Sequence, residues 1–126
     1  MFTATAAFSG FSVDDQAKAK EFYGQILGLE LDNDEMGLSF KLPGGGSIFV
    51  YAKDDHKPAT YTALNFVVDN VDESLEALAS KGVAFEHYEG MTDEKGVARG
   101  LSRNQGPDIA WFKDPAGNIL SILQAK

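Results

Sequence analysis

The chain repeats itself, and this repeat constrains the fold more than any other feature. Residues 11–31 read FSVDDQAKAKEFYGQILGLEL, and residues 66–85 read FVVDNVDESLEALASKGVAF. Each stretch predicts a strand end, an aspartate or asparagine helix cap, an amphipathic helix, a glycine stop and a new strand. Asp15 superposes on Asn70 at an offset of 55 residues (70 − 15). A tandem repeat of this size indicates two equivalent structural modules.

The second half of each module also matches. The run FKLPGGGSIFVY at residues 40–51 aligns with FKDPAGNILSIL at residues 112–123 when one residue is gapped in the turn. Each module therefore predicts the order β-α-β-β-β, and the fold class is α+β. We place the first module at residues 1–52, a polar linker at 53–60 and the second module at 61–126. Modules of about sixty residues are marginal alone, so we predict one domain over residues 1–126.

The expected elements follow from apolar periodicity and from glycine and proline punctuation. The first helix begins near Asp15 and ends at Gly28, and the second is capped by Asn70 and ends at Gly82. Strands are expected at residues 5–13, 29–31, 38–42, 47–51, 62–68, 83–88, 108–113 and 119–124. The glycine run at 44–46 predicts a hairpin and not a phosphate loop, because no helix follows it. Residues 90–106 are expected to form one long irregular loop.

Composition removes several classes of function. The formal charge is −8 and no basic stripe is present, so a nucleic-acid partner is not expected. No apolar run is long enough to span a membrane, and the start of the chain lacks the pattern of a signal peptide, which favours a cytoplasmic protein. The cysteine count is zero, so there are no disulfides, thiol nucleophiles or cysteine metal sites.

Two motifs carry a resemblance to a known family. Within the doubled β-α-β-β-β unit, Asp15 is followed by the pair Phe22-Tyr23, and the run FKDPAGN occupies residues 112–118. This doubled pattern resembles the vicinal oxygen chelate superfamily, which contains glyoxalase I, extradiol dioxygenases and bleomycin-resistance proteins. The resemblance implies that the two modules form a curved mixed sheet around a U-shaped cleft. It also implies a homodimer, in which the partner chain completes each cleft.

The positions that hold a metal ion in this family are occupied by other residues here. Metal-dependent members carry a histidine seven residues before the helix cap and a glutamate on the last strand of each module. In this sequence those positions fall on Phe8, Ala63, Val50 and Ser121. Divalent ions of these enzymes need imidazole or carboxylate donors. We therefore expect no metal ion and no other cofactor.

The same positions define the cleft, because ligand positions of this fold point inward. Period-two alternation then brings Ser12, Asn65, Ile48 and Val50 to the inner side together with the other family positions. Two further candidates come from residue chemistry: Trp111 offers a stacking surface, and His87 could act as a donor or base. The predicted ligand contacts are Phe8, Ser12, Val50, Ala63, Asn65, His87, Trp111 and Ser121; no catalytic residue is assigned.

Several of these residues keep a second interpretation. Trp111 could instead be structural, and His87 an exposed edge residue. His56 lies in the linker beside two aspartates, which favours a solvated loop over a ligand. Arg99 and Arg103 lie in the long loop, where they could close over an anion or remain solvated. The cleft itself could be a filled core with no ligand.

Three functions compete on this sequence. The preferred hypothesis is a metal-free small-molecule-binding protein of the glyoxalase/bleomycin-resistance type, which sequesters a cationic or aromatic compound. The acidic charge agrees with it, because a negative surface concentrates cations. The alternative is a superfamily enzyme of lyase or isomerase type with a non-standard active site, although no nucleophile and base occur in recognisable spacing. A third is a subunit with no small ligand.

Overall fold

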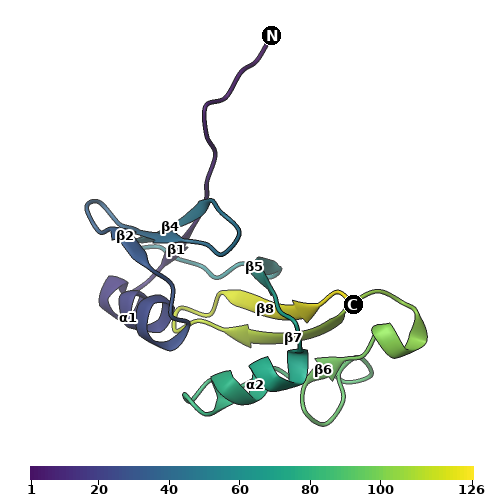
Figure 1. Cartoon of the computed structure of the whole chain (residues 1–126). Helices are drawn as coiled ribbons and strands as arrows, with labels where there is room; N and C mark the ends of the chain where they lie inside the picture. Colours follow the sequence, from purple (N-terminus) through teal and green to yellow (C-terminus); the bar gives the residue numbers. More distant parts are fainter. The chain divides into compact units, whose positions relative to one another are not determined.

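The computed structural model describes residues 1–126 and contains two compact units, Met1–Pro58 and Ala59–Lys126. The boundary falls inside the predicted linker at residues 53–60. Each unit holds one four-stranded mixed sheet with a helix packed on it (Figure 1). None of the helices is long and apolar enough to cross a lipid bilayer. The predicted pair of tandem βαβββ modules is confirmed, with the strands arranged as two separate sheets.

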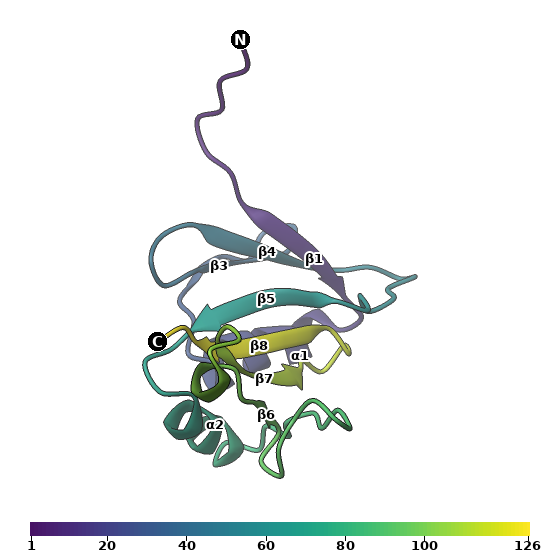
Figure 2. The ribbon, with the colours of Figure 1, turned by 90° about the vertical axis from the view of Figure 1, so that its right-hand side faces the viewer.

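The first unit has its strands in the order β1-β4-β3-β2. Strand β1 runs parallel to β4, and the other neighbours are antiparallel (Figure 2). The elements are β1 (Ser9–Val13), α1 (Gln16–Glu21), the π-helical turn η1 (Phe22–Ile26), β2 (Leu31–Asn33), β3 (Leu38–Lys41) and β4 (Ser47–Ala52). The glycine run at 44–46 turns the chain between β3 and β4, as expected for a hairpin.

Helix α1 begins where the sequence predicts. The Asp15 carboxylate accepts the Lys18 backbone N–H at 3.0 Å, which satisfies one of the free donors of the first turn. The helix continues into η1, and Gly28 ends it at φ +74°. The π-helical turn was not predicted. Its adjacent side chains Phe22 and Tyr23 are both buried.

The core of the first unit lies between the sheet and this helix. Tyr23 is fully buried, with its ring centroid 5.9 Å from Phe11 and 5.8 Å from Phe40. Phe11 is the register partner of Val50, and Phe40 is the partner of Ile48. Register partners share a face of the sheet, so Ile48 and Val50 face the helix. The prediction that they face the same side as Phe8 is therefore wrong.

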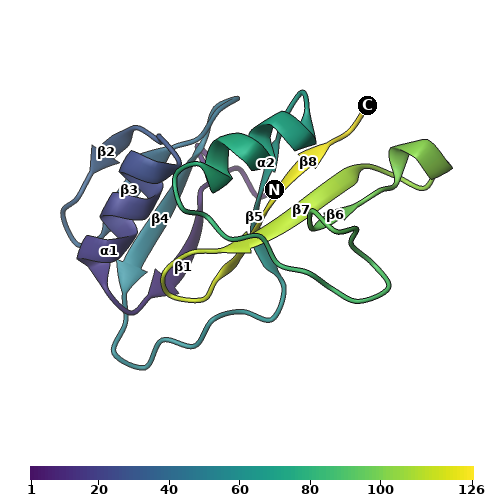
Figure 3. The same cartoon turned by 90° about the horizontal axis from the view of Figure 1, so that it is seen from below.

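The second unit repeats this arrangement with the order β5-β8-β7-β6. Its elements are β5 (Thr62–Val67), α2 (Val71–Ala79), β6 (Val97–Ala98), the 3-10 turn η2 (Leu101–Arg103), β7 (Asp108–Lys113) and β8 (Ile119–Gln124). Helix α2 packs on β7 and β8 (Figure 3). The buried side chains between them are Val71, Val97, Ala110, Phe112, Leu120 and Ile122.

The strand predicted at residues 83–88 is absent, and the predicted loop at 90–106 contains the edge strand. Phe85 makes one isolated bridge to Phe112, and the Glu86 N–H donates to the Trp111 carbonyl at 2.8 Å. Further along β7, the edge is occupied by β6, in which Val97 pairs with Ala110. The physical reason is that two short segments share the edge of β7, so neither can extend along its whole length.

The cap of α2 gives a direct test of the local structure. The Asn70 side-chain oxygen accepts the Glu73 N–H at 3.0 Å. We expect Asn70→Ala to lower the free energy of unfolding by about 1 kcal/mol, because the first helical turn loses this acceptor. Urea unfolding followed by Trp111 fluorescence measures the effect within the same unit. Asn70→Asp keeps an acceptor and should lose much less; equal losses in both variants would contradict the assigned role.

Candidate functional site

The closing hairpins of the two modules correspond without any gap, and this fixes which of their side chains share a face. Strand partners Phe40 and Ile48 of the first unit match Phe112 and Leu120 of the second at one offset of 72 residues (112 − 40 and 120 − 48). The gap placed in the turn by the sequence alignment is therefore wrong. Without it, the residue equivalent to Ser121 is Phe49 and not Val50. A slip of one residue in a strand moves its side chains to the opposite face.

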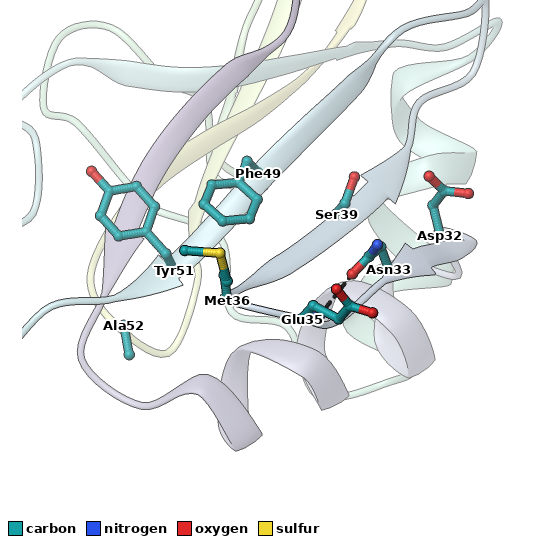
Figure 4. Close-up of a pocket in the computed structure, with 8 residues that line it drawn as sticks. All are labelled: Asp32, Asn33, Glu35, Met36, Ser39, Phe49, Tyr51 and Ala52. Carbon is teal, nitrogen blue, oxygen red and sulfur yellow. Dashed lines mark hydrogen bonds between the residues drawn. The ribbon is translucent and has the colours of Figure 1, made fainter.

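A pocket of about 490 Å³ lies on the face of the first sheet that points away from its helix (Figure 4). Its floor is formed by Phe49 and Tyr51, whose rings are nearly parallel at 24° with centroids 5.7 Å apart. The ring of Phe8 meets that of Phe49 edge-on, with the two ring centroids 6.4 Å apart. The side chains that line the pocket are Asp32, Asn33, Glu35, Met36, Ser39, Phe49, Tyr51 and Ala52.

The rim of the pocket is a tight turn between β2 and β3. The Asn33 side-chain oxygen accepts the Glu35 N–H at 2.7 Å, which is drawn as a dashed line in Figure 4. Met36 follows in the left-handed backbone region at φ +54°, with its side chain 98% exposed. Gly37 packs under the ring of Phe49 so closely that a Cβ atom there would lie 2.5 Å from the ring. This contact holds the turn against the aromatic floor.

The charge at this pocket is negative. Asp32 and Glu35 line it, and the lining set contains no basic side chain. The nearby Lys41 donates to Glu30 at 2.8 Å. This hydrogen bond and the attraction between the two opposite charges raise the pKa of Lys41 and lower the pKa of Glu30. A charge already paired in this way offsets little of the rim's negative potential, so the site favours a cation.

Two of the predicted contacts of the first unit lie on the pocket side of the sheet. Phe8 is 69% exposed and touches the aromatic floor, and Ser12 is the register partner of Tyr51. The Ser12 hydroxyl is hydrogen-bonded to Nδ1 of His56 at 2.6 Å. His56 is therefore half-buried against β1 and not a solvated linker residue. Val50 is fully buried on the opposite face.

In the second unit, the structure brings Asn65, Trp111 and Ser121 together. Ser121 is the register partner of both other residues, and its hydroxyl donates to the Asn65 side-chain oxygen. Ser121 is fully buried, whereas Trp111 is half-buried with its ring 5.5 Å from that of Tyr88. The common face of these three residues follows the predicted alternation. Their contact with a ligand stays a prediction.

The remaining two candidates of the second unit lie outside regular strand positions. Ala63 falls where the register of β5 shifts between Thr62 and Leu64, so alternation does not fix its direction. His87 is exposed in the segment that follows the Phe85 bridge. Residues 85–88 do not form a paired strand, so the strand alternation assumed for His87 does not apply.

The long-loop arginines have different roles from those considered. Arg99 donates to both oxygens of Asp72 at 2.8 and 2.9 Å and to Asp93 at 2.9 Å, with Asp108 at 3.7 Å. The carboxylates of Asp72 and Asp93 raise the pKa of Arg99 through hydrogen bonds, against the effect of burial. Arg99 thus links the start of α2 to the loop and to β7. Arg103 is exposed.

Sequence reasoning missed the pocket residues of the first unit. Phe49 and Tyr51 flank Val50, and two aromatic side chains at i and i+2 share a face of a strand. Aligned without the gap, that pattern would have pointed to them. No sequence signal indicated Met36, because its exposure and its left-handed backbone depend on the packing of Gly37 against Phe49.

The residues at the family's metal positions do not fit a metal ion. Phe8, Phe49 and Ala63 have no donor atom, and the Ser121 hydroxyl is bonded to Asn65. No group of three or more histidine, aspartate or glutamate side chains lies close enough to hold such an ion. The absence of a metal stays a prediction, which metal analysis of the purified protein can test.

Comparisons with known proteins agree over nearly the whole chain. A family model described as Glyoxalase/Bleomycin resistance protein/Dioxygenase superfamily matches residues 6–122. An antibiotic-binding protein from Streptomyces sp. CB03234 is 26% identical, with a TM-score of 0.70 over 99% of this chain and 100% of that one. A member of the same superfamily from Sphaerobacter thermophilus is also 26% identical, with a TM-score of 0.68 over 96% and 98%.

Two further comparisons limit what can be concluded about activity. A lactoylglutathione lyase from Agrobacterium tumefaciens is 20% identical, with a TM-score of 0.66 over 97% of this chain and 95% of that one. At this identity the likeness concerns the fold alone. No protein of curated function matches the sequence.

Proposed function

We propose, from the premise that this chain belongs to the Glyoxalase/Bleomycin resistance protein/Dioxygenase superfamily, that it is a metal-free binding protein for an aromatic organic cation. The binding surface is the pocket on the face of the first sheet that points away from its helix. The observation that carries this proposal is the combination of a stacked aromatic floor, Phe49 and Tyr51, with an acidic rim that contains Asp32 and Glu35.

The chemistry of this pocket suits one class of ligand. A planar aromatic molecule can stack on the two rings, and a positive charge on it is attracted to their faces. Such contacts contribute about 0.5–2 kcal/mol each, depending on desolvation. The carboxylates of the rim add a longer-range attraction that salt screens. A neutral aromatic compound keeps the stacking but loses the attraction of the rim.

The comparisons support a binding function over the alternative. The antibiotic-binding protein from Streptomyces is 26% identical and is covered along its whole length. The lyase hypothesis is supported by similarity of fold alone, and no arrangement of possible catalytic residues favours it. The homodimer and the cytoplasmic location stay predictions.

A fluorescence titration with N-methylacridinium tests the proposal. Acridine, uncharged at mildly alkaline pH, is the matched neutral probe. We expect N-methylacridinium to bind more tightly than acridine, and Phe49→Ala and Tyr51→Ala each to weaken it by about 0.5–2 kcal/mol. Glu35→Gln should weaken binding of the cation and leave acridine unaffected.

The control is Tyr61→Ala, because Tyr61 is 71% exposed and lies outside the pocket. Melting temperatures of all variants show whether the sheet is intact. If folded Phe49→Ala and Tyr51→Ala bind the cation as the unchanged protein does, the pocket is not the binding surface and the proposal is wrong.

A further inference from the structure

Met36 combines two properties that rarely occur together. Its side chain is apolar and 98% exposed, and its backbone lies at φ +54°, which is unfavourable for a residue with a Cβ atom. Only one other non-glycine residue of the chain, Asn104, has a positive φ. Asparagine adopts this region more readily than methionine, so the surrounding structure must offset the cost at Met36.

The turn around Met36 supplies that restraint. Asn33 caps the Glu35 N–H, the Gly37 N–H donates to the Glu35 carbonyl, and Gly37 lies against the ring of Phe49. The Met36 side chain consequently extends toward the rings of Phe49 and Tyr51, where it lines the pocket (Figure 4). A ligand stacked on these rings would meet the thioether of Met36, a polarizable group that makes favourable contacts with aromatic rings.

We propose that Met36 is an oxidation site that controls ligand affinity: conversion of its thioether to the sulfoxide by a peroxide weakens binding of the aromatic cation. This inference rests on the proposed binding function of the same pocket. In the reaction, the sulfur attacks one oxygen of the peroxide, the O–O bond breaks, and one oxygen remains on sulfur. The sulfur loses two electrons, and the peroxide is reduced to water or an alcohol.

The physical effect follows from the change in polarity. A sulfoxide is polar and hydrogen-bonds to water, whereas a thioether does not bind water strongly. Packing an aromatic ligand against the sulfoxide therefore costs free energy, because the bound water must be removed. The loss of a sulfur–aromatic contact corresponds to a roughly two- to tenfold weaker affinity. The chain contains no cysteine and three methionines, so thioethers are its readily oxidised sulfur atoms.

The test treats the protein with limiting hydrogen peroxide and locates the sulfoxide by peptide mass spectrometry. Met91, which is 58% exposed and outside the pocket, is the internal comparison. We expect Met36 to oxidise before Met91. The dissociation constant of N-methylacridinium is then measured for treated and untreated samples of the unchanged protein and of Met36→Leu, each compared with its own untreated sample.

The expected result is a two- to tenfold loss of affinity in the treated protein, no loss in treated Met36→Leu, and recovery after methionine sulfoxide reductase. An unchanged affinity with Met36 fully oxidised would overturn the inference, as would an equal loss in Met36→Leu or slower oxidation of Met36 than of Met91. Phe49→Ala separates the two proposals. If Phe49→Ala binds N-methylacridinium normally, the proposed function and this inference both fail. If Phe49→Ala binds weakly and oxidation of the unchanged protein has no effect on its affinity, only this inference fails.

Discussion

Replacement of Arg99 by methionine is expected to lower the free energy of unfolding by about 2–3 kcal/mol. Methionine keeps much of the side-chain length and removes only the charge and its donors. Three charge-assisted hydrogen bonds to Asp72 and Asp93 are lost. The remaining carboxylates then repel one another beside Asp108, whose side chain is only 11% exposed. Urea unfolding monitored by Trp111 fluorescence measures the loss.

Arg103→Met is the matched control, because Arg103 lies in the same loop and is exposed. Its removal should change stability by less than about 0.5 kcal/mol. Equal effects of the two replacements would show that the ion pairs of Arg99 contribute nothing specific, and that the loop responds only to the loss of a positive charge.

The same pair of proteins should respond differently to acid. Hydrogen bonds from Arg99 lower the pKa of Asp72 despite its partial burial. Burial alone would raise the pKa of Asp93, but hydrogen bonds from the Val97 N–H, Arg99 and the Lys95 N–H outweigh it, and the net effect is a lower pKa. A carboxyl group whose pKa is lowered by folding stabilises the folded state at pH values above its ordinary pKa, which is 3.8 for aspartate. The stability difference between the unchanged protein and Arg99→Met should therefore shrink as the pH falls below that value.

Tyr23→Ala is expected to have the largest effect on the first unit, a loss of about 3–5 kcal/mol. Tyr23 is fully buried, and its ring lies 5.2 to 5.9 Å from those of Phe22, Phe40 and Phe11. Removing it leaves a cavity between helix and sheet that the surrounding rings cannot fill. The melting curve and hydrogen exchange of the β4 amides measure this loss of stability, since β4 carries the pocket residues Phe49 and Tyr51.

Phe8→Ala provides the comparison on the other face of the same sheet. Phe8 is 69% exposed and touches Phe49 alone among the rings described, so its removal should cost far less stability. Tyr23→Phe keeps the ring and separates the contribution of the hydroxyl from that of packing. A loss from Phe8→Ala as large as that from Tyr23→Ala would contradict the assignment of the core to the helix side.

The sequence predicts features of the fold that depend on local chemistry. Asp15 and Asn70 were identified as helix caps from residue type and spacing, and both accept the expected N–H. The strand 83–88 could not be predicted correctly, because it competes with β6 for the edge of β7, and β6 occupies part of that edge. That competition involves residues more than ten positions away in the chain.

The candidate site was harder to predict than the fold. The gap placed in the turn at 44–46 aligned Val50 with Ser121, and so put Val50 on the predicted cleft side and Phe49 on the opposite side. The structure shows that the turn has the same length as its counterpart, so every residue of β4 faces the side opposite to the one predicted. The position of Met36 depends on a left-handed turn held by a ring from another strand, which no local pattern reports.

The way the two sheets end has a consequence for how this chain behaves in a crowded solution. An exposed strand edge is a template on which another chain can add, and long flat edges promote aggregation. Each sheet has one very short outer strand: β2 contains three residues and β6 contains two, and the pairing of β2 with β3 is irregular, whereas the opposite outer strands β1 and β5 contain five and six residues. At the β2 and β6 edges a partly unfolded copy would find too few free backbone groups to extend a sheet from one molecule to the next, so any such addition is expected at β1 or β5.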